Sequence, residues 1–352
     1  MSDALLAGYQ GLVVDLDGVV YRGPDAVDHA ADALNAAVDQ GLPVMYATNN
    51  AGRPAATVAE HLTELGVRTD AEHVVTSAQA GAALLADQLE PGTTVLAVGG
   101  PGVAIALREV GLDPVTPGER IEDPEVAGRV RAVLQGYGTE LTWSDLKEAA
   151  YAVSAGATWM ATNVDLTIPT ERGIAPGNGS AVAAVRNVIG RDPQVAGKPY
   201  PPLYERCAER AERDVARMLA VGDRLDTDIE GANASGMDSL LVLTGVDGPL
   251  ALASAPDRRR ATYVALDLRS LHEPYAAAQL RDGAEAPAAS CGDAVATVDG
   301  HGDDATLTVS GGDPIEQVRA AVTAVWAARD AGRVGIPLPA GVAEPLEALD
   351  PR

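Results

Sequence analysis

Residues 10–20 read Gln-Gly-Leu-Val-Val-Asp-Leu-Asp-Gly-Val-Val, an apolar run that ends in two aspartates. The run at 12–14 is typical of a buried strand in a parallel sheet. Residues two apart in an extended chain project to the same side, so we expect Asp15 and Asp17 to share one space at the carboxyl edge of that sheet. Two carboxylates so close repel each other unless a cation separates them or one holds a proton. The pair therefore indicates a metal site, an acid–base pair or both, and a turn cap is the structural alternative.

Strand and helix signals alternate on either side of a long middle segment. Before that segment, strands are expected at 12–15, 44–47 and 74–75, and helices at 28–40 and 54–66. After it, the alternation resumes with a helix near 201–213, a strand at 218–221, a helix from about 226 and a strand at 239–243. This order predicts an α/β protein with a Rossmann-like parallel sheet and right-handed crossovers.

The middle segment, residues 82–191, carries an αβ pattern of its own. Strands are expected at 95–98, 132–135 and 159–162, and helices near 102–110 and 143–155. The stretch 169–180 contains so much glycine and proline that no regular structure is expected there. We therefore expect a core built from 1–81 and 192–270, with a separate αβ domain inserted between its halves.

A small α+β extension is expected over 271–352. Residues 281–293 are predicted to be a linker, 294–309 a hairpin and 314–331 an amphipathic helix. The last 20 residues, rich in proline, alanine and glutamate, are expected to be loose.

Charge, hydropathy and cysteine spacing limit the partners and the compartment that we expect for the protein. The net charge of −24 argues against nucleic-acid and anionic-membrane partners, because the field of the whole molecule repels them. No apolar run reaches the roughly 18 residues that a membrane span requires, so no membrane insertion is expected. Cys207 and Cys291 lie far apart without metal-type spacing, which fits a reducing compartment, and we expect a cytoplasmic protein.

Four short polar segments fall at the ends of predicted strands. The first contains Asp15 and Asp17, and the others are Thr48-Asn49-Asn50, Gly197-Lys198-Pro199 and the run from Gly222-Asp223 to Asp228. Carboxylates at 15 and 223, with the carbonyl of residue 17, are the oxygen ligands that Mg²⁺ prefers. Thr48, Asn49 and the Lys198 ammonium are suited to hold phosphate oxygens. The set as a whole fits the positioning and charge neutralisation that phosphoryl transfer needs.

These strings resemble the four motifs of the haloacid dehalogenase (HAD) superfamily. D-L-D-G-V, T-N-N, A-G-K-P and G-D-R-L-D-T-D-I are similar to its NagD/p-nitrophenylphosphatase branch over roughly residues 8–270. V-V-T-S-A-Q at 74–79 and P-T-E-R-G-I-A-P-G-N-G-S at 169–180 resemble actinobacterial glycerol-3-phosphate phosphatases. The resemblance implies a HAD core with a large αβ cap inserted between the second and third motifs. Relatives carry a truncated acetyltransferase-like extension where this chain has residues 271–352.

The resemblance also implies a role for each matching residue. Asp15 would be the nucleophile that forms an aspartyl-phosphate, and Asp17 the general acid and base. Thr48, Asn49, Asn50 and Lys198 would hold the phosphate. Asp15, the backbone carbonyl of Asp17 and Asp223 would bind Mg²⁺, with Asp228 supporting them from outside. The structural alternatives are a helix cap for Asn50, a first-turn residue for Asp228, a strand edge for Thr48 and a surface lysine for Lys198.

The cap is expected to select the substrate. Asn163 and Ser180 are the cap side chains expected nearest a polyol, and ordinary turns are the alternative for both. The expected reaction is Mg²⁺-dependent hydrolysis of a small phosphate ester, first of all glycerol 3-phosphate, in a protein for which the resemblance also allows a cap-to-cap homodimer. The alternatives left open are phosphoglycolate, pyridoxal phosphate or a nucleotide as substrate, and a regulatory phosphate-binding module without activity.

Overall fold

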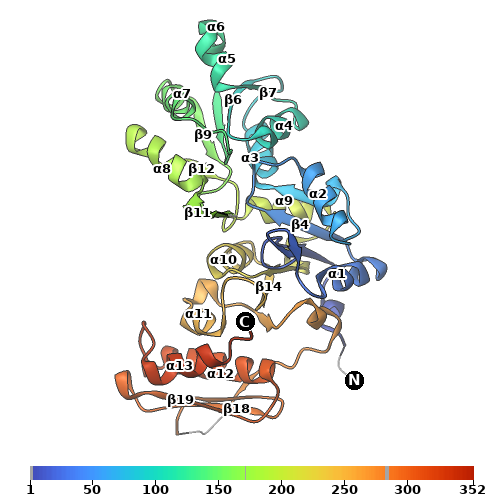
Figure 1. Ribbon diagram of the computed structural model, residues 1–352, viewed down its shortest axis with the longest axis vertical. Helices are drawn as coiled ribbons and strands as arrows, with labels where there is room; N and C mark the ends of the chain where they lie inside the picture. Colours follow the sequence, from blue (N-terminus) through green and yellow to red (C-terminus); the bar gives the residue numbers. More distant parts are fainter. Residues whose placement is uncertain (1–2, 171, 282–284) are drawn as a thin grey trace. The chain divides into compact units, whose positions relative to one another are not determined.

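The computed structural model describes residues 3–170, 172–281 and 285–352, and it divides the chain into two compact units (Figure 1). One unit comprises residues 1–43 and 216–352, and the other residues 44–215. In the described ranges, no helix is long and apolar enough to cross a membrane.

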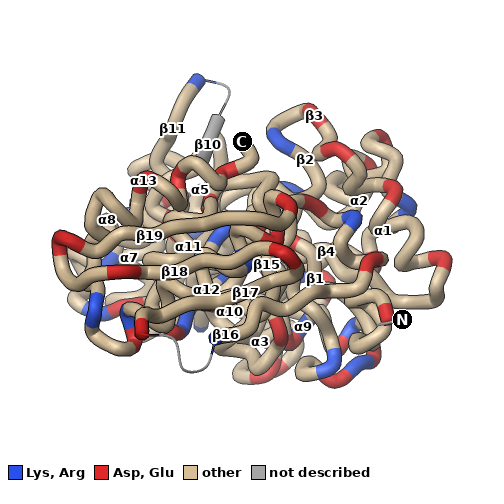
Figure 2. Tube along the Cα trace, turned by 90° about the horizontal axis from the view of Figure 1, so that it is seen from below, with Lys and Arg blue, Asp and Glu red and all other residues tan. Residues whose placement is uncertain are grey.

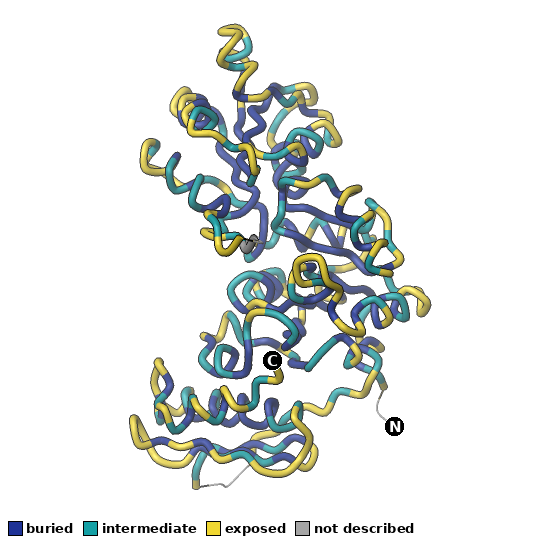
Figure 3. The backbone as a smooth tube through the Cα atoms, viewed as in Figure 1, coloured by how far each residue is buried: buried dark blue, intermediate teal, exposed yellow. Residues whose placement is uncertain are grey.

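The first unit contains a parallel sheet in the order β15-β14-β13-β1. Its strands are β1 (Gly11–Val14), β13 (Met218–Gly222), β14 (Asp238–Val242) and β15 (Tyr263–Ala265), with a small hairpin of β2 (Tyr21–Arg22) and β3 (Asp25–Ala26). Its helices are α1 (Ala30–Asp39), α10 (Glu230–Ala234) and α11 (Pro249–Ser254). Every residue of β1 and β13 is buried, as the apolar runs predict, and the central strands are dark along their length in Figure 3.

The same unit includes the C-terminal extension. Its antiparallel sheet is formed by β16 (Gln279–Leu280), β17 (Ala288–Cys291), β18 (Ala294–Asp299) and β19 (Thr306–Ser310), and its helices are α12 (Pro314–Asp330) and α13 (Ala340–Ala348). Helix α12 starts where Asp313 and Glu316 form a capping box, and it packs on β17 and β18. Its apolar face joins residues of α11, β14 and β15 in one hydrophobic core. The extension is therefore not a separate folding module.

Two predictions for the extension are wrong. The expected linker contains strand β17, because small buried side chains at 288, 289 and 291 pack under α12; residues 282–284 of that stretch lie outside the described part. The expected loose tail contains helix α13, whose Val342 and Leu346 are fully buried. In both places the local composition predicted irregular structure. The small apolar residues there form a strand and a helix because they pack against elements from other parts of the chain.

The second unit contains two groups of parallel strands. β4 (Val44–Thr48) pairs with β5 (Val74–Thr76), and α2 (Ala55–Glu64), α3 (Ser77–Ala86) and α9 (Pro202–Arg210) belong to this part. A five-stranded sheet has the order β12-β9-β8-β6-β7. Its strands are β6 (Thr94–Val98), β7 (Asp113–Val115), β8 (Ala132–Gln135), β9 (Thr158–Ala161) and β12 (Gln194–Val195). The remaining helices are α4 (Pro101–Glu109), α5 (Pro117–Glu122), α6 (Pro124–Arg129), α7 (Trp143–Ser154) and α8 (Asn178–Ile189).

The prediction of irregular structure over 169–180 is also wrong. The stretch contains most of an antiparallel hairpin, β10 (Thr167–Thr170) with β11 (Gly173–Pro176), and then the start of α8; Glu171 lies outside the described residues. Its glycines permit close approach: a Cβ at Gly177 or Gly179 would overlap the backbone of residues 164 and 165. Here glycine marks tight packing of a helix start, and not the absence of regular structure.

Acidic residues recur along the whole trace, and lysine and arginine positions are fewer (Figure 2). The α/β fold with its buried parallel strands is confirmed. The predicted domain boundaries at 81, 191 and 270 stay a prediction.

Candidate active site

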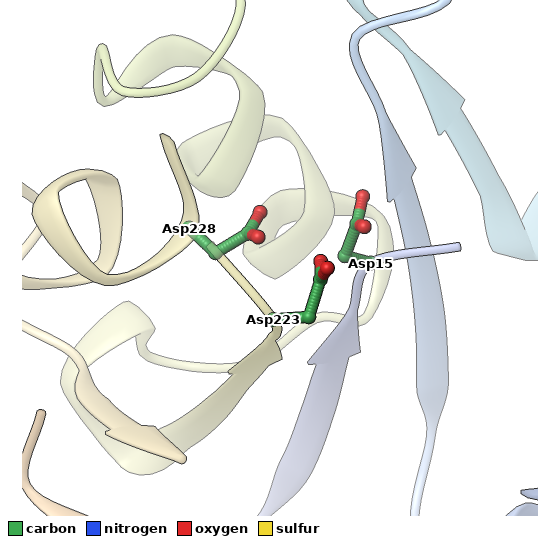
Figure 4. A group of neighbouring side chains, drawn as sticks. All are labelled: Asp15, Asp223 and Asp228. Carbon is green, nitrogen blue, oxygen red and sulfur yellow. The ribbon is translucent and has the colours of Figure 1, made fainter. Parts of the chain in front are cut away.

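Three aspartates of the first unit converge at the carboxyl ends of adjacent strands. Asp15 follows β1, Asp223 follows β13, and Asp228 lies in the turn beyond Asp223 (Figure 4). One carboxylate oxygen from each lies within 4.8 Å of the others. Asp223 and Asp228 are buried, at 1% and 3% exposure, and Asp15 is half-buried. The neighbouring strands thus bring together carboxylates separated by more than 200 residues of sequence.

The loop after β1 places Asp15 and Asp17 in different surroundings. The Asp15 N–H donates to the Val221 carbonyl at 2.9 Å, which continues the β1–β13 ladder up to this residue. Asp17 is exposed, and it lies in a turn that the Gly18 N–H closes by donating to the Tyr21 carbonyl at 2.7 Å. Gly18 has a φ of +81°, and a Cβ there would overlap the Asp223 carboxylate. Only glycine combines that backbone with that approach.

Asp223 is held by a loop on its own unit. The Val246 N–H donates to its Oδ2 at 2.7 Å, and the Asp247 N–H donates to its backbone carbonyl at 3.0 Å. A Cβ at Gly245 would overlap the same carboxylate. Sequence reasoning missed this loop, since no motif marks it and its partner is 23 residues away.

Asp228 lies in a wide π-helical turn, η4 (Leu225–Ile229), that leads into α10. Its Oδ2 accepts from the Arg224 N–H at 3.1 Å, and a Cβ at Gly222 would overlap it. The Leu225 N–H donates to Asp247 Oδ2 at 2.7 Å, so the turn and the loop that holds Asp223 are bonded to each other. Burial raises the pKa of Asp247, with the nearby Asp226 adding to that effect.

The donor set fits a hard divalent cation. Three carboxylates with converging oxygens, packed so that glycine alone fits beside them, are the oxygen-rich surroundings that Mg²⁺ takes up. Buried anions at this separation repel each other, and a bound cation removes that repulsion. Among the residues that the structure describes, this is the only group of three or more potential ligands.

The second motif forms a tight cap at the end of β4 in the second unit. Thr48 is buried at 8% exposure, and its Oγ1 accepts from the Asn50 N–H at 3.1 Å. The Asn50 Oδ1 accepts in turn from the Gly52 N–H at 3.0 Å. The side chain of Asn50 thus closes a turn over 50–52, and it is not the N-cap of α2, which is Pro54.

Asn49 is bonded to the backbone of Lys198. Its Oδ1 accepts from the Lys198 N–H at 2.8 Å, and its Nδ2 donates to the Lys198 carbonyl at 3.0 Å. Lys198 itself is buried at 3% exposure, and its Nζ donates to the Ala47 carbonyl at 3.2 Å. A Cβ at Gly197 would overlap the Asn49 side chain. The side-chain amide of Asn49 therefore joins the second motif to the third, with its oxygen and its nitrogen each bonded to the backbone of Lys198.

Neither predicted cap residue offers an uncommitted side chain. Asn163 Nδ2 donates to the Asn49 carbonyl at 2.6 Å, and its Oδ1 accepts from the Asp165 N–H at 3.1 Å. Ser180 Oγ donates to the Leu166 carbonyl at 2.7 Å. Both side chains organise the segment 163–167, a loop that leads into the first residue of β10.

The sequence did not single out two further residues that take part in the hydrogen bonds around 163–167. Asp165 accepts from Asn49 Nδ2 at 3.1 Å, and the buried Asn178 donates to the carbonyls of Gln135 and Asn163. A signal existed for Asp165, since a carboxylate follows the Ala-Thr-Asn string at the end of β9. Cys207 is buried, which raises the pKa of its thiol to about 12 and disfavours the reactive thiolate.

Two segments of the chain match models of haloacid dehalogenase-like hydrolases. Residues 12–113 match the model described as haloacid dehalogenase-like hydrolase, and residues 195–271 match a HAD-hydrolase-like model. The parallel sheet and the aspartate cluster agree with both matches, and the chain belongs to the haloacid dehalogenase-like hydrolase family.

Its similarity to individual proteins is closer still. It is 47% identical to the D-glycerol 3-phosphate phosphatase of Mycobacterium tuberculosis over 322 residues, 91% of this chain and 86% of that protein. The crystal structure of a glycerol phosphate phosphatase from the same organism, in complex with magnesium, covers 99% of this chain and 98% of its own, with 42% identity and a TM-score of 0.80. A p-nitrophenyl phosphatase from Archaeoglobus fulgidus covers 76% of this chain and 99% of its own, with 25% identity and a TM-score of 0.68.

The proteins in these comparisons are phosphatases, and the chain is an enzyme of that class. The predicted resemblance to the p-nitrophenylphosphatase branch and to glycerol-3-phosphate phosphatases is confirmed.

Proposed function

We propose that the chain is a Mg²⁺-dependent phosphomonoesterase that hydrolyses glycerol 3-phosphate to glycerol and phosphate. The observation that carries the proposal is the convergence of Asp15, Asp223 and Asp228 in a chain 47% identical to a D-glycerol 3-phosphate phosphatase. Asp15 and Asp223, with the backbone carbonyl of Asp17, would hold Mg²⁺, and Asp228 would support the site. The bound ion supplies positive charge that lets an anionic carboxylate approach an anionic phosphate.

The reaction proceeds in two displacements. A carboxylate oxygen of Asp15 attacks phosphorus, the bond from phosphorus to the ester oxygen breaks, and Asp17 gives its proton to the leaving alkoxide. Asp17 then takes a proton from water, whose oxygen attacks phosphorus and breaks the bond to Asp15. Inorganic phosphate leaves, and both aspartates return to their starting states. The exposure of Asp17 suits a group that exchanges protons with the substrate and with water.

We assign phosphate binding to Thr48, Asn49, Asn50 and Lys198 on the basis of their motif positions. The hydrogen bonds of the second unit support a division of labour among them. Lys198 brings the charge, Asn49 orients the Lys198 backbone, and the Asn50 side chain shapes the turn at 50–52. The backbone N–H groups of such a turn are suited to bind phosphate oxygens.

Catalysis is assigned to 1–81 and 192–270, and substrate selection to the cap at 82–191. Asn163 and Ser180 remain the proposed substrate-selecting positions. Their hydrogen bonds support an indirect action, in which they set the conformation of the loop at 163–167.

The test uses purified protein with Mg²⁺ and a panel of glycerol 3-phosphate, phosphoglycolate, pyridoxal phosphate and a nucleoside monophosphate. Glycerol 3-phosphate should give the highest kcat/KM, and a higher value for another ester would replace it as substrate. Asp15→Asn should lower kcat by at least about 10³-fold, and chelation of the metal should abolish activity until Mg²⁺ is restored. Full activity in Asp15→Asn would exclude the covalent mechanism. Tight phosphate binding without turnover of any ester would instead identify a regulatory module.

We further propose that the protein is cytoplasmic. Cys207 and Cys291 are free and buried, which supports a reducing compartment.

We also propose that the protein forms a homodimer. Exposed apolar side chains on the cap support self-association, with Trp143 at 72% and Tyr151 at 57% exposure on α7, and Val188 at 72% on α8. Sedimentation velocity at micromolar concentration tests the dimer, and a single monomeric species would refute it.

A further inference from the structure

The C-terminal segment contacts the loop that holds Asp223. Arg352 Nη1 donates to the carbonyls of Gly245 and Val246, the latter at 2.7 Å. These residues belong to the loop 244–248 between β14 and α11, whose Val246 N–H binds the Asp223 carboxylate. The Arg352 guanidinium is thus two hydrogen bonds from a proposed magnesium ligand.

Asp350 fixes the orientation of the Arg352 side chain. Its Nε and backbone N–H donate to Asp350 Oδ1 at 2.8 and 3.1 Å, and its Nη2 forms an ion pair with Asp350 Oδ2. The Arg352 side chain is 31% exposed and that of Asp350 is 23% exposed. A planar guanidinium held along one edge by a carboxylate presents its other edge in a fixed direction. Here that edge meets the two loop carbonyls.

The loop is a junction for several parts of the proposed site. Besides Asp223, it binds the turn that contains Asp228, through Asp247 and the Leu225 N–H. It also binds the turn beside Asp17, because Thr244 Oγ1 donates to the Gly18 carbonyl at 2.6 Å. Displacement of the loop would therefore move Asp223 and would disturb the turns that contain Asp228 and Gly18. At its far end, a Cβ on Gly248 would overlap Asp350 and Arg352, which shows how closely the C-terminal segment packs there.

We propose that Arg352, oriented by Asp350, is a positioning residue for the magnesium site. It fixes loop 244–248 in the conformation that aims Asp223 at the metal, and so the C-terminal extension serves metal affinity. The inference rests on the proposed function, because it requires that Asp223 binds Mg²⁺. Groups that hold metal ligands in place contribute to metal affinity without touching the ion.

The test measures Mg²⁺ binding directly, by isothermal titration of metal-free full-length protein without ester. Arg352→Gln should weaken the Mg²⁺ Kd by about three- to tenfold, less than loss of a direct outer-shell partner. Gly248→Ala, which displaces the Asp350–Arg352 pair from the other side, should weaken it similarly. Saturating Mg²⁺ should restore kcat in both variants to within about twofold, since no group that touches the ester is changed.

Arg329→Gln is the matched control. Arg329 also belongs to the extension and also donates to two backbone carbonyls, those of Ala253 at 2.7 Å and Ala255 at 2.6 Å, but these lie in and just after α11, beyond the end of the loop. It should lower thermal stability and leave the Mg²⁺ Kd unchanged. An unchanged Kd in Arg352→Gln, or an equal loss in Arg329→Gln, would overturn the positioning role while the phosphatase assignment stands. Absence of Mg²⁺ binding by the unsubstituted chain would overturn the metal site itself, and this inference with it.

Discussion

Asn49 illustrates how a single side chain acquires a role from a distant partner. Its amide meets both backbone groups of Lys198, which is 149 residues away in sequence. The motif position indicated a phosphate ligand, and the structure adds a task in which the side chain orients a lysine backbone. The Lys198 ammonium can balance phosphate charge only where its backbone places it.

Substitution of Asn49 by alanine should therefore reduce turnover. Both bonds to the Lys198 backbone are lost, and misplacement of a charged group by about 1 Å can lower the rate by about 10²-fold. We expect kcat/KM to fall by between about tenfold and that limit. Asn233→Ala is the control: Asn233, in α10 after the fourth motif, also bonds two backbone carbonyls, those of Arg258 and Arg260, and neither carbonyl belongs to a motif. Equal activity losses in the two variants would contradict the role of Asn49.

Helix α12 shows how one element joins the extension to the parallel sheet. Its apolar face contributes Val318, Val322 and Val325 to the core shared with β14, β15 and α11. At its C-terminal end, Asp330 accepts two hydrogen bonds from Arg260, at 2.8 and 2.5 Å. Arg260 also lies 5.2 Å from the ring centre of Trp326, so its guanidinium meets α12 at two positions.

The Arg260 guanidinium holds the pKa of Asp330 below its usual value. A carboxyl group whose pKa is lowered on folding stabilises the native state above its unfolded pKa, and this contribution is lost as the pH falls through the folded value. Asp330→Asn should lower Tm by about 1–2 °C at pH 7, a small change because the Asp330 side chain is 57% exposed and solvent screens its ion pair. The difference from the unsubstituted chain should shrink as the pH approaches 3. Asp299→Asn, at an exposed position of β18, controls for loss of one negative charge, and a pH-independent difference at 330 would refute the ion-pair explanation.

In the first unit, the parallel strands and the extension share one hydrophobic core. A shared core predicts that both parts unfold together, because neither can bury its apolar surface without the other. This arrangement also explains why the C-terminal segment can reach a loop beside Asp223.

Val325→Ala tests that cooperativity. The side chain is fully buried in the extension, and its truncation should lower the free energy of unfolding by about 2 kcal/mol. Loss of activity and loss of helical circular dichroism should shift to lower urea concentration together. Val38→Ala on α1, where the side chain is 38% exposed, should change the stability by less than about 0.5 kcal/mol. Activity that persists after the extension has unfolded would show two independent modules.

Local sequence patterns were enough to predict the parallel α/β core and to pick out Asp15, Asp223 and Asp228 as candidate site residues. Apolar runs define β1, β4 and β13, and the motif residues follow them at strand ends, so the sequence predicts which edge of a parallel sheet they occupy. Short-range signals failed at β17, at α8 and at α13. There, small residues and glycines acquire meaning only from the surfaces they pack on.

The convergence of Asp15, Asp223 and Asp228, the pairing of Asn49 with Lys198, and the contact of Arg352 with loop 244–248 depend on the folded chain. Each of these arrangements joins residues remote in sequence through hydrogen bonds or packing. Such contacts do not change the hydrophobic periodicity of the segments they join, so the sequence pattern does not predict them. The sequence alone thus placed Asp15 and Asp17 at a strand end, because an apolar run followed by carboxylates is a local signal. The convergence of the proposed metal ligands was set by tertiary structure, because it requires strands and loops from both ends of the chain.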